Sequence, residues 1–217
     1  MDKKSIEASL NKVLEEKGNK KFTQTIDLII KLKDLDLKKN DQQIDFFINL
    51  PFSKGKEAKI CGLVGPELVS ESQKHFDHTI EAHDFDALKS NSKEIKKLAE
   101  TYDYFVAQAT IMPQVATVFG RILGSRGKMP NPKAGCVVPP KAQLGPLAGR
   151  LKQTVRVSAK TSLVISVPVG KENQEVSELV ENIDSIYKGV VSHAVQGENN
   201  FKSAALKLTM GKLVRID

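Results

Sequence analysis

The sequence predicts a mixed α/β and α+β protein of two domains, one of them discontinuous and interrupted by the other. Both ends of the 217-residue chain contain stretches in which apolar and polar residues alternate, as in half-buried strands of an antiparallel sheet. The middle contains nearly continuous apolar strands separated by helices, as in a parallel sheet covered on both faces. Neither end is long enough for a comfortable core, so we expect the two ends to share one.

The N-terminal end predicts one helix and two strands. The helix ends before Gly18, and its apolar stripe contains Ile6, Leu10, Val13 and Leu14. Alternating apolar residues then favour strands over 26–32 and 44–50, joined by a polar connection. We expect these strands to pair antiparallel, with Pro51 ending the second.

The middle of the chain predicts a parallel α/β arrangement. Strands are expected at residues 60–65, 78–81 and 104–109, and helices at 92–100, 113–123 and 146–152. Residues 124–146 form a long loop rich in Gly, Pro and positive charge. A loop of this length inside a compact domain is usually functional.

The C-terminal end predicts a strand, a helix and a strand, at residues 163–169, 176–190 and 204–208. Joined with the N-terminal end, it gives a discontinuous split β-α-β domain, which is a four-stranded antiparallel sheet with helices on one face. This domain is expected at residues 1–54 and 155–217, and the inserted domain at 55–154. Two crossings, near 52–56 and 153–155, would connect the domains and act as a hinge.

Positive charge is concentrated in one part of the chain. The net charge is +7, and residues 104–171 contain ten Lys and Arg but no Asp or Glu. Such an uncompensated field favours polyanions, and neutralised phosphates release counterions. The alternative is a basic face that only keeps the protein in solution.

The composition excludes several classes of protein. No apolar run approaches the length of a membrane span, and the charged N-terminus lacks the apolar core of a signal peptide. Cys61 and Cys136 give neither a disulfide framework nor the spacing of a zinc site. We therefore expect a reduced, cytoplasmic protein that needs no cofactor.

The sharpest local motif runs from Gly124 to Pro132. It resembles a phosphate-binding loop, but Ile122 stands where that motif needs its first Gly, and Met129 where it needs Ser or Thr. The loop also follows a helix rather than a strand. We therefore favour a basic turn that presents backbone amides to RNA phosphates over nucleotide hydrolysis, with a simple connecting loop as the alternative.

Enzymatic and metal-binding alternatives find less support. No dinucleotide fingerprint follows either apolar strand. His75, His78 and His83 lie near two aspartates, but their spacing matches no metal motif, so we interpret them as surface residues. An enzyme built on the inserted domain would lack an acidic residue over 104–171, and a protein–protein scaffold is a third alternative.

The last predicted strand has one polar face. Ser203, Ala205, Lys207 and Thr209 lie on it, and Thr25 would lie on a similar face of the first strand. Hydroxyls and a cation suit ribose 2′-hydroxyls and phosphates. A sheet face that only meets solvent explains the same pattern equally well.

Three segments together resemble a known family: Lys21–Thr25, Leu123–Pro132 and Lys207–Lys212. With the order of helices and strands, they identify the chain as similar to the large-subunit ribosomal protein L-one family in its archaeal form. The resemblance implies a split RNA-binding domain with an inserted Rossmann-like domain. It also implies binding to the mobile ribosomal RNA stalk near the exit of deacylated tRNA, and repression of the protein's own messenger RNA.

The resemblance also implies which residues contact RNA: Lys21, Phe22, Thr25, Ser203, Thr209, Met210 and Gly211. Charge and strand parity add Lys160 and Lys207. A second, weaker contact would come from loop residues Gly124, Arg126, Gly127, Lys128 and Met129. The expected partners are large-subunit rRNA, exit-site tRNA and the protein's own mRNA, with no membrane and a monomeric free state.

Three features of the sequence depart from what the family resemblance leads us to expect. Phe52-Ser53 replaces a usual His-Gly after the second strand, which affects the first crossing. Ser125 stands where proline is usual, so the loop is less restricted. Strict alternation places Phe22 on the core face, so an RNA contact there requires an irregular start to the strand.

Overall fold

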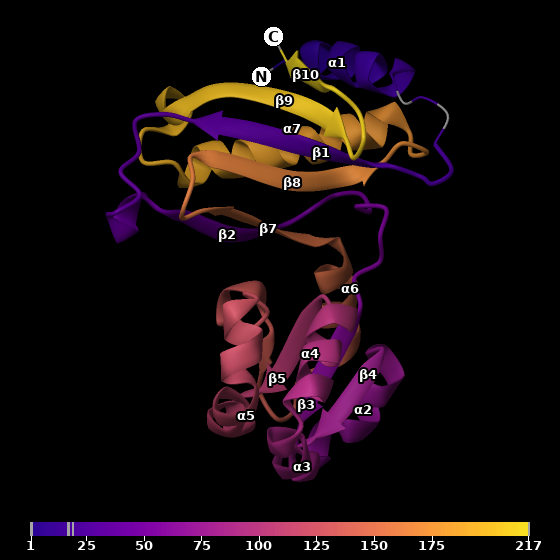
Figure 1. Cartoon of the computed structure of the whole chain (residues 1–217), viewed down its shortest axis with the longest axis vertical. Helices are drawn as coiled ribbons and strands as arrows, with labels where there is room; N and C mark the ends of the chain where they lie inside the picture. The colour runs from indigo at the N-terminus through magenta and orange to yellow at the C-terminus, as the bar shows by residue number, and fades with distance from the viewer. Residues whose placement is uncertain (1, 17, 19, 217) are drawn as a thin grey trace. The chain divides into compact units, whose positions relative to one another are not determined.

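The computed structural model describes residues 2–16, 18 and 20–216, which form two compact units (Figure 1). The first unit contains Met1–Glu57 and Gln153–Asp217, and the second contains Ala58–Lys152. Each unit has its own hydrophobic core. No helix among the described residues is both long and apolar enough to cross a bilayer.

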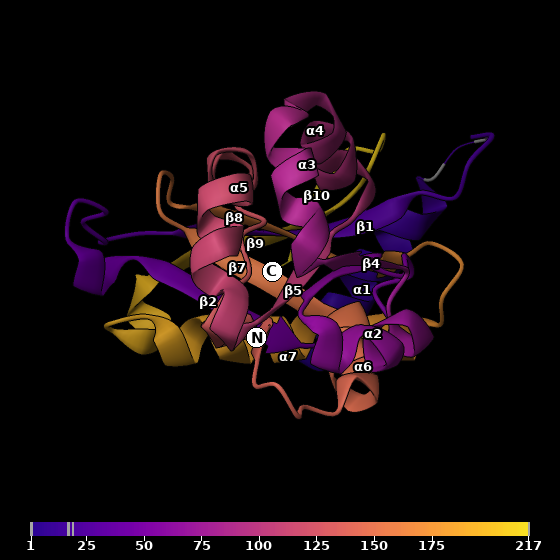
Figure 2. The ribbon, with the colours of Figure 1, turned by 90° about the horizontal axis from the view of Figure 1, so that it is seen from below.

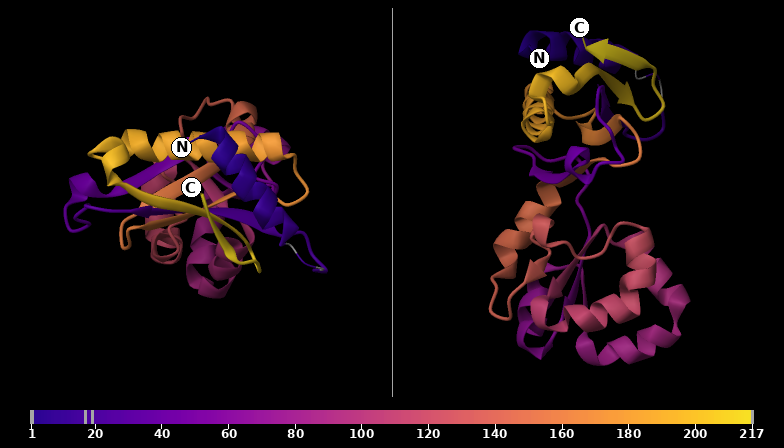
Figure 3. Two further views of the ribbon diagram at one scale, coloured as in Figure 1. Left: turned by 90° about the horizontal axis from the view of Figure 1, so that it is seen from above. Right: turned by 90° about the vertical axis from the view of Figure 1, so that its left-hand side faces the viewer.

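The first unit is built on a four-stranded antiparallel sheet with the strand order β10-β9-β1-β8. The strands are β1 (Thr25–Leu32), β8 (Val164–Lys171), β9 (Phe201–Leu208) and β10 (Leu213–Ile216). Helices α1 (Lys3–Glu15) and α7 (Val176–His193) contact each other and cover the same face (Figure 3, left). The predicted four-stranded antiparallel sheet with helices on one face is therefore confirmed.

The identity of the strands in this sheet differs from our prediction. We expected residues 26–32 to pair with 44–50, but both edges of β1 are occupied by β8 and β9. Strand β2 (Ile44–Asn49) instead pairs with β7 (Thr154–Ala159) in a separate two-stranded sheet. The alternating apolar residues of β7 were missed because we assigned its first residues to a crossing. In the structure α6 ends at Gln153 and β7 begins at the next residue.

The core of the first unit follows from the alternation in β1. Its even-numbered apolar side chains, Ile26, Leu28, Ile30 and Leu32, are all buried. They face the α1 stripe of Ile6, Leu10 and Val13, which is also buried. Each such side chain stabilises the fold by roughly 1.5–3 kcal/mol. The other face of the same sheet is left without helices.

The second unit is a parallel α/β layer structure with the strand order β4-β3-β5-β6. The strands are β3 (Ile60–Val64), β4 (His78–Glu81), β5 (Tyr104–Gln108) and β6 (Val137–Val138). The helices are α2 (Val69–His75), α3 (Phe85–Ser90), α4 (Ser92–Thr101), α5 (Met112–Ser125) and α6 (Leu144–Gln153) (Figure 2). The predicted parallel arrangement is confirmed, although β6 lies inside the segment we interpreted as a loop.

The two faces of this parallel sheet are covered by different helices. Cys61 and Leu63 of β3 pack with α3, α4 and α5 in one core. Gly62 faces the other way, where an added Cβ would collide with the Ser72 hydroxyl of α2.

Both cysteines of the chain lie in the second unit and are buried. Burial raises the pKa of the Cys61 thiol to about 12 and that of the Cys136 thiol to about 11, so both stay protonated and unreactive at neutral pH.

Candidate nucleic-acid interface

The helix-free face of the four-stranded sheet, which we call the open face, brings together residues from both ends of the chain. In register, Lys31 of β1 lies beside Ser203, and Asp27 lies beside Lys207 of β9. Thr25 and Thr209 continue the same face at one end of the strands. The structure thus gathers Thr25, Ser203, Lys207 and Thr209, although they are separated by up to 184 residues in sequence.

Thr25 and Thr209 are joined by three hydrogen bonds. The Thr209 backbone N–H donates to the Thr25 carbonyl over 3.1 Å, and the Thr25 N–H donates to Thr209 Oγ1 over 3.1 Å. Thr209 Oγ1 also donates its proton to the Thr25 carbonyl over 3.3 Å. A hydroxyl has one proton and two lone pairs, so the exposed Thr209 oxygen keeps one lone pair for an external donor.

The turn after β9, Thr209–Gly211, projects from the end of the sheet. Met210 is 64% exposed, so its apolar side chain is accessible to a ligand. Its N–H donates to Gln24 Oε1 over 3.0 Å, and the Gly211 N–H donates to the Leu208 carbonyl over 3.1 Å. A Cβ on residue 211 would lie 3.0 Å from Leu208 Cβ, so only glycine fits the turn without displacing its neighbour.

Phe22 lies outside the regular strand. Because β1 begins at Thr25, the alternation that would bury Phe22 does not reach it, and the ring is 51% exposed. Lys21, next to it, is also exposed. An exposed aromatic ring beside a cation is suited to stack on an unpaired base.

Charges on the open face are not uniformly positive. Desolvation raises the pKa of Asp27 above its ordinary value, and the nearby Lys207 ammonium lowers it by a smaller amount. Arg215 of β10 is exposed and lies beside Ala205 in the register. Our sequence reasoning missed Arg215 because β10 has four residues and was not assigned a strand.

Lys160 lies outside the four-stranded sheet, directly after β7. Its ammonium is 2.7 Å from Asp45 Oδ2, and Arg156 binds the same carboxylate over 2.9 and 3.2 Å. Burial by itself would raise the pKa of Asp45, but the hydrogen bonds from Arg156 and Lys160 hold it below its ordinary value. The structure therefore does not bring Lys160 together with the Thr25–Thr209 end of the open face.

The basic loop of the second unit uses its charges and amides internally. Lys128 Nζ donates to the carbonyls of Ala99 and Tyr102 over 2.9 and 2.7 Å, and so caps the C-terminal end of α4. Arg126 pairs with Glu100 over 2.8 Å. This hydrogen bond and the positive charge of Arg126 lower the pKa of Glu100.

The amides of this loop are also satisfied within the unit. The Gly127 N–H donates to the Gly124 carbonyl over 3.0 Å, and the Lys128 N–H donates to the Leu123 carbonyl over 2.9 Å. These bonds close the C-terminus of α5, with Gly127 at a φ of 65°. Met129 packs against the core. Gly124 and Gly127 stay exposed, so the structure gives the loop a structural role that sequence reasoning had not assigned.

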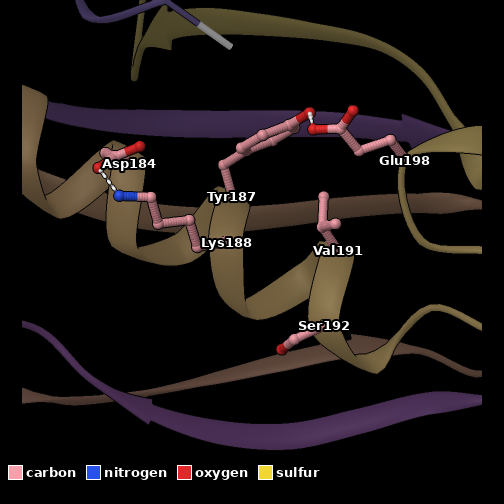
Figure 4. A pocket seen from close by; sticks show the side chains of 6 residues that line it. All are labelled: Asp184, Tyr187, Lys188, Val191, Ser192 and Glu198. Carbon is pink, nitrogen blue, oxygen red and sulfur yellow. Dashed lines mark hydrogen bonds and ion pairs between the residues drawn. The ribbon is translucent and has the colours of Figure 1, made fainter.

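One shallow pocket of about 270 Å³ lies in the helical layer of the first unit (Figure 4). It is lined by α7 residues and by Glu198. Its charged groups already have partners, because Asp184 binds Lys188 over 2.7 Å and Glu198 accepts from the Tyr187 hydroxyl over 3.3 Å. We find no support in this pocket for a small-molecule site that competes with the open face.

The histidines considered for metal binding are engaged separately. His83 lies 3.2 Å from Glu81 and 3.1 Å from Asp84, whereas His78 stacks on Tyr102. Within residues 2–16, 18 and 20–216, no group of three or more His, Cys, Asp or Glu side chains is placed to hold a metal ion.

The architecture defines a class: proteins in which a discontinuous antiparallel sheet unit, open on one face, is interrupted by a parallel α/β unit. The model of the Ribosomal protein L1p/L10e family matches residues 13–212 of this chain. The chain therefore belongs to this family, whose members are structural ribosomal proteins and not enzymes.

Relatives from archaea match nearly the whole chain. "Large ribosomal subunit protein uL1" of Nanoarchaeum equitans is 40% identical over 94% of this chain and 96% of that protein. The protein of the same name from Methanosphaera stadtmanae is 36% identical over 97% of this chain and 98% of its own length. That of Methanothermococcus thermolithotrophicus is 36% identical over the full length of both chains.

Proposed function

We propose that this protein is a structural component of the large ribosomal subunit and binds the mobile stalk of its RNA through the open face. The relatives are named as large-subunit proteins, which supports the proposed location on the ribosome in the cytoplasm. The observation that carries the proposed contact is the Thr25–Thr209 pair, which fixes an exposed hydroxyl beside the exposed Met210.

The chemistry of this contact is directional. The free lone pair of Thr209 Oγ1 can accept a hydrogen bond from a ribose 2′-hydroxyl, which DNA lacks. Gly211 lets the RNA backbone approach closely, and the exposed ring of Phe22 offers a stacking surface. Lys21 and Lys207 add affinity that falls with salt. The proposed site thus reads the shape and sugar of RNA more than its base sequence.

Two further roles follow from the same proposal. A protein on the stalk near the exit site would take part in releasing deacylated tRNA, with the loop Gly124–Met129 as a second RNA contact. A messenger RNA that copies the stalk structure would occupy the same open face, so the protein would repress translation of its own message when ribosomal RNA is saturated. The second role requires that ribosomal RNA and messenger RNA compete for the open face.

The decisive experiment is titration of the free protein with three ligands of equal length: a large-subunit stalk RNA, an unrelated RNA duplex, and DNA with the stalk sequence. We expect the stalk RNA to bind at least about a hundredfold more tightly than either alternative at physiological salt. Equal affinity for all three would reject the proposal. Sequencing of RNA cross-linked to the protein in cells then reports whether exit-site tRNA and the protein's own mRNA are bound.

A further inference from the structure

The turn Thr209–Gly211 is held by three successive backbone N–H groups. Thr209 and Gly211 donate to the backbone carbonyls of Thr25 and Leu208, both over 3.1 Å. Met210 donates instead to a side chain, Gln24 Oε1, over 3.0 Å. The position of the exposed Met210 therefore depends on a side-chain acceptor, which a substitution can remove without altering the backbone.

We propose that Gln24 is a positioning residue that sets the turn for RNA binding without touching RNA. Gln24 is only 1% exposed, so a ligand on the surface does not reach it. The inference rests on the proposed function and deepens it, because it names what holds the RNA-facing turn in the free protein.

Gln24 is itself fixed by its neighbours. Its backbone carbonyl accepts from the Glu172 N–H over 3.1 Å, next to the end of β8. The residue thus joins three segments that are distant in sequence: the start of β1, the end of β8 and the turn after β9. With its backbone fixed and its side chain only 1% exposed, Gln24 has little freedom to follow a displaced turn, so its Oε1 defines where the Met210 N–H lies.

The loss of this acceptor has a directional consequence. A backbone N–H without a partner near the protein interior is costly, so the turn would shift until the Met210 N–H reaches water or another acceptor. That shift moves the exposed Met210 side chain and the Thr209 hydroxyl relative to Thr25. Removing the acceptor changes no charge on the open face. We therefore expect the variant to discriminate less between RNA shapes, while the salt dependence of RNA binding stays the same.

The test compares two variants of the full chain. Gln24→Met removes the acceptor at nearly constant volume. Gln42→Met is the matched control, since Gln42 Oε1 accepts from the Asp36 N–H over 2.6 Å outside the open face. The first readout is selectivity, the affinity for stalk RNA divided by that for an unrelated duplex. The second is hydrogen exchange of the Met210 amide in the free protein.

We expect Gln24→Met to lose selectivity about tenfold, with an unchanged salt slope and faster exchange at Met210, whereas Gln42→Met stays within about threefold of the original protein. Unchanged Met210 exchange in Gln24→Met, or equal losses in Gln24→Met and Gln42→Met, would overturn the inference. A selective original protein whose selectivity survives Gln24→Met overturns the positioning role alone. An unselective original protein rejects the proposed function as well.

Discussion

At the scale of single residues, the Thr25–Thr209 end of the open face leaves few hydrogen-bonding positions free for a ligand. Thr209 illustrates this, because most of the capacity of its hydroxyl is used by the Thr25 backbone. What is left is one lone pair at a fixed place, which suits an acceptor role toward a ribose and excludes the donor role that the free amino acid also offers.

Thr209→Ala should weaken stalk RNA binding by about 1–3 kcal/mol, because it removes the acceptor and leaves the Thr25 N–H without its partner. Thr209→Ser should bind nearly normally, since it keeps the hydroxyl. Filter-binding titrations measure both, with Thr161→Ala, an exposed threonine between β7 and β8, as control. Unchanged affinity in Thr209→Ala would remove this hydroxyl from the site.

Asp27→Asn should increase RNA affinity at neutral pH by about 0.5–1 kcal/mol, since it removes a carboxylate that repels phosphates from the open face. Burial raises the pKa of Asp27 above 3.8, so the ionised form costs stability in the folded protein. The stabilisation of the variant should therefore appear above about pH 4 and vanish below it, where the carboxyl is protonated in both states. Melting temperatures across this range, and titrations at pH 7, test both signs.

At the scale of elements, the Gly-rich loop after α5 acts as a clamp on α4. Lys128 reaches two carbonyls at the end of that helix, and the amides of the loop close the end of its own helix. Sequence reasoning identified the loop by its glycines and charges, yet the targets of those charges are supplied by another helix. Only the fold determines which carbonyls lie within reach.

Lys128→Ala should destabilise the second unit by about 1–2 kcal/mol, because two charge-assisted hydrogen bonds at the end of α4 are lost. If the loop also contacts RNA, the salt slope falls by about one. Lys133→Ala removes a neighbouring exposed cation and should alter only the slope. Equal unfolding free energies for the two variants would contradict the clamp.

The sequence predicted where helices and strands lie better than it predicted which strands pair with one another. Alternation located β1, β8 and β9, and the helical stripes located α1 and α7, because each pattern is set by local burial. Alternation did not predict strand pairing. The strands β1 and β2 alternate equally well, and no local feature of the sequence indicates the partner strands of either one. Alternation also failed for Gln24, whose polar side chain belongs to no motif and becomes important only where three segments meet.

At the scale of the whole molecule, the second unit interrupts the first without contributing to its core. The two points where the chain leaves and re-enters the first unit lie close together there. The Leu50 N–H donates to the Gln153 carbonyl over 3.2 Å, and Lys54 Nζ donates to the Thr154 carbonyl over 3.0 Å. Asn182 also fixes this segment by accepting from the Phe52 N–H over 3.0 Å.

Replacing residues 58–152 by a few glycines should therefore leave a first unit that folds cooperatively. Because the open face is intact, its affinity for stalk RNA should stay within about tenfold of the full chain. Circular dichroism melts and RNA titrations measure the two expectations. A folded deletion variant that binds more than about a hundredfold more weakly would show that the second unit supplies most of the binding energy.

The central position of β1 has a consequence for the order of synthesis. Both of its hydrogen-bonding edges are completed by strands from the far end of the chain, β8 and β9. During synthesis from the N-terminus, β1 is made before its partner strands β8 and β9, whereas all of the second unit is made before β8 and can already fold. The proposed RNA-binding surface can form only after β9 has been synthesised, so a product terminated before β9 should not bind ribosomal RNA.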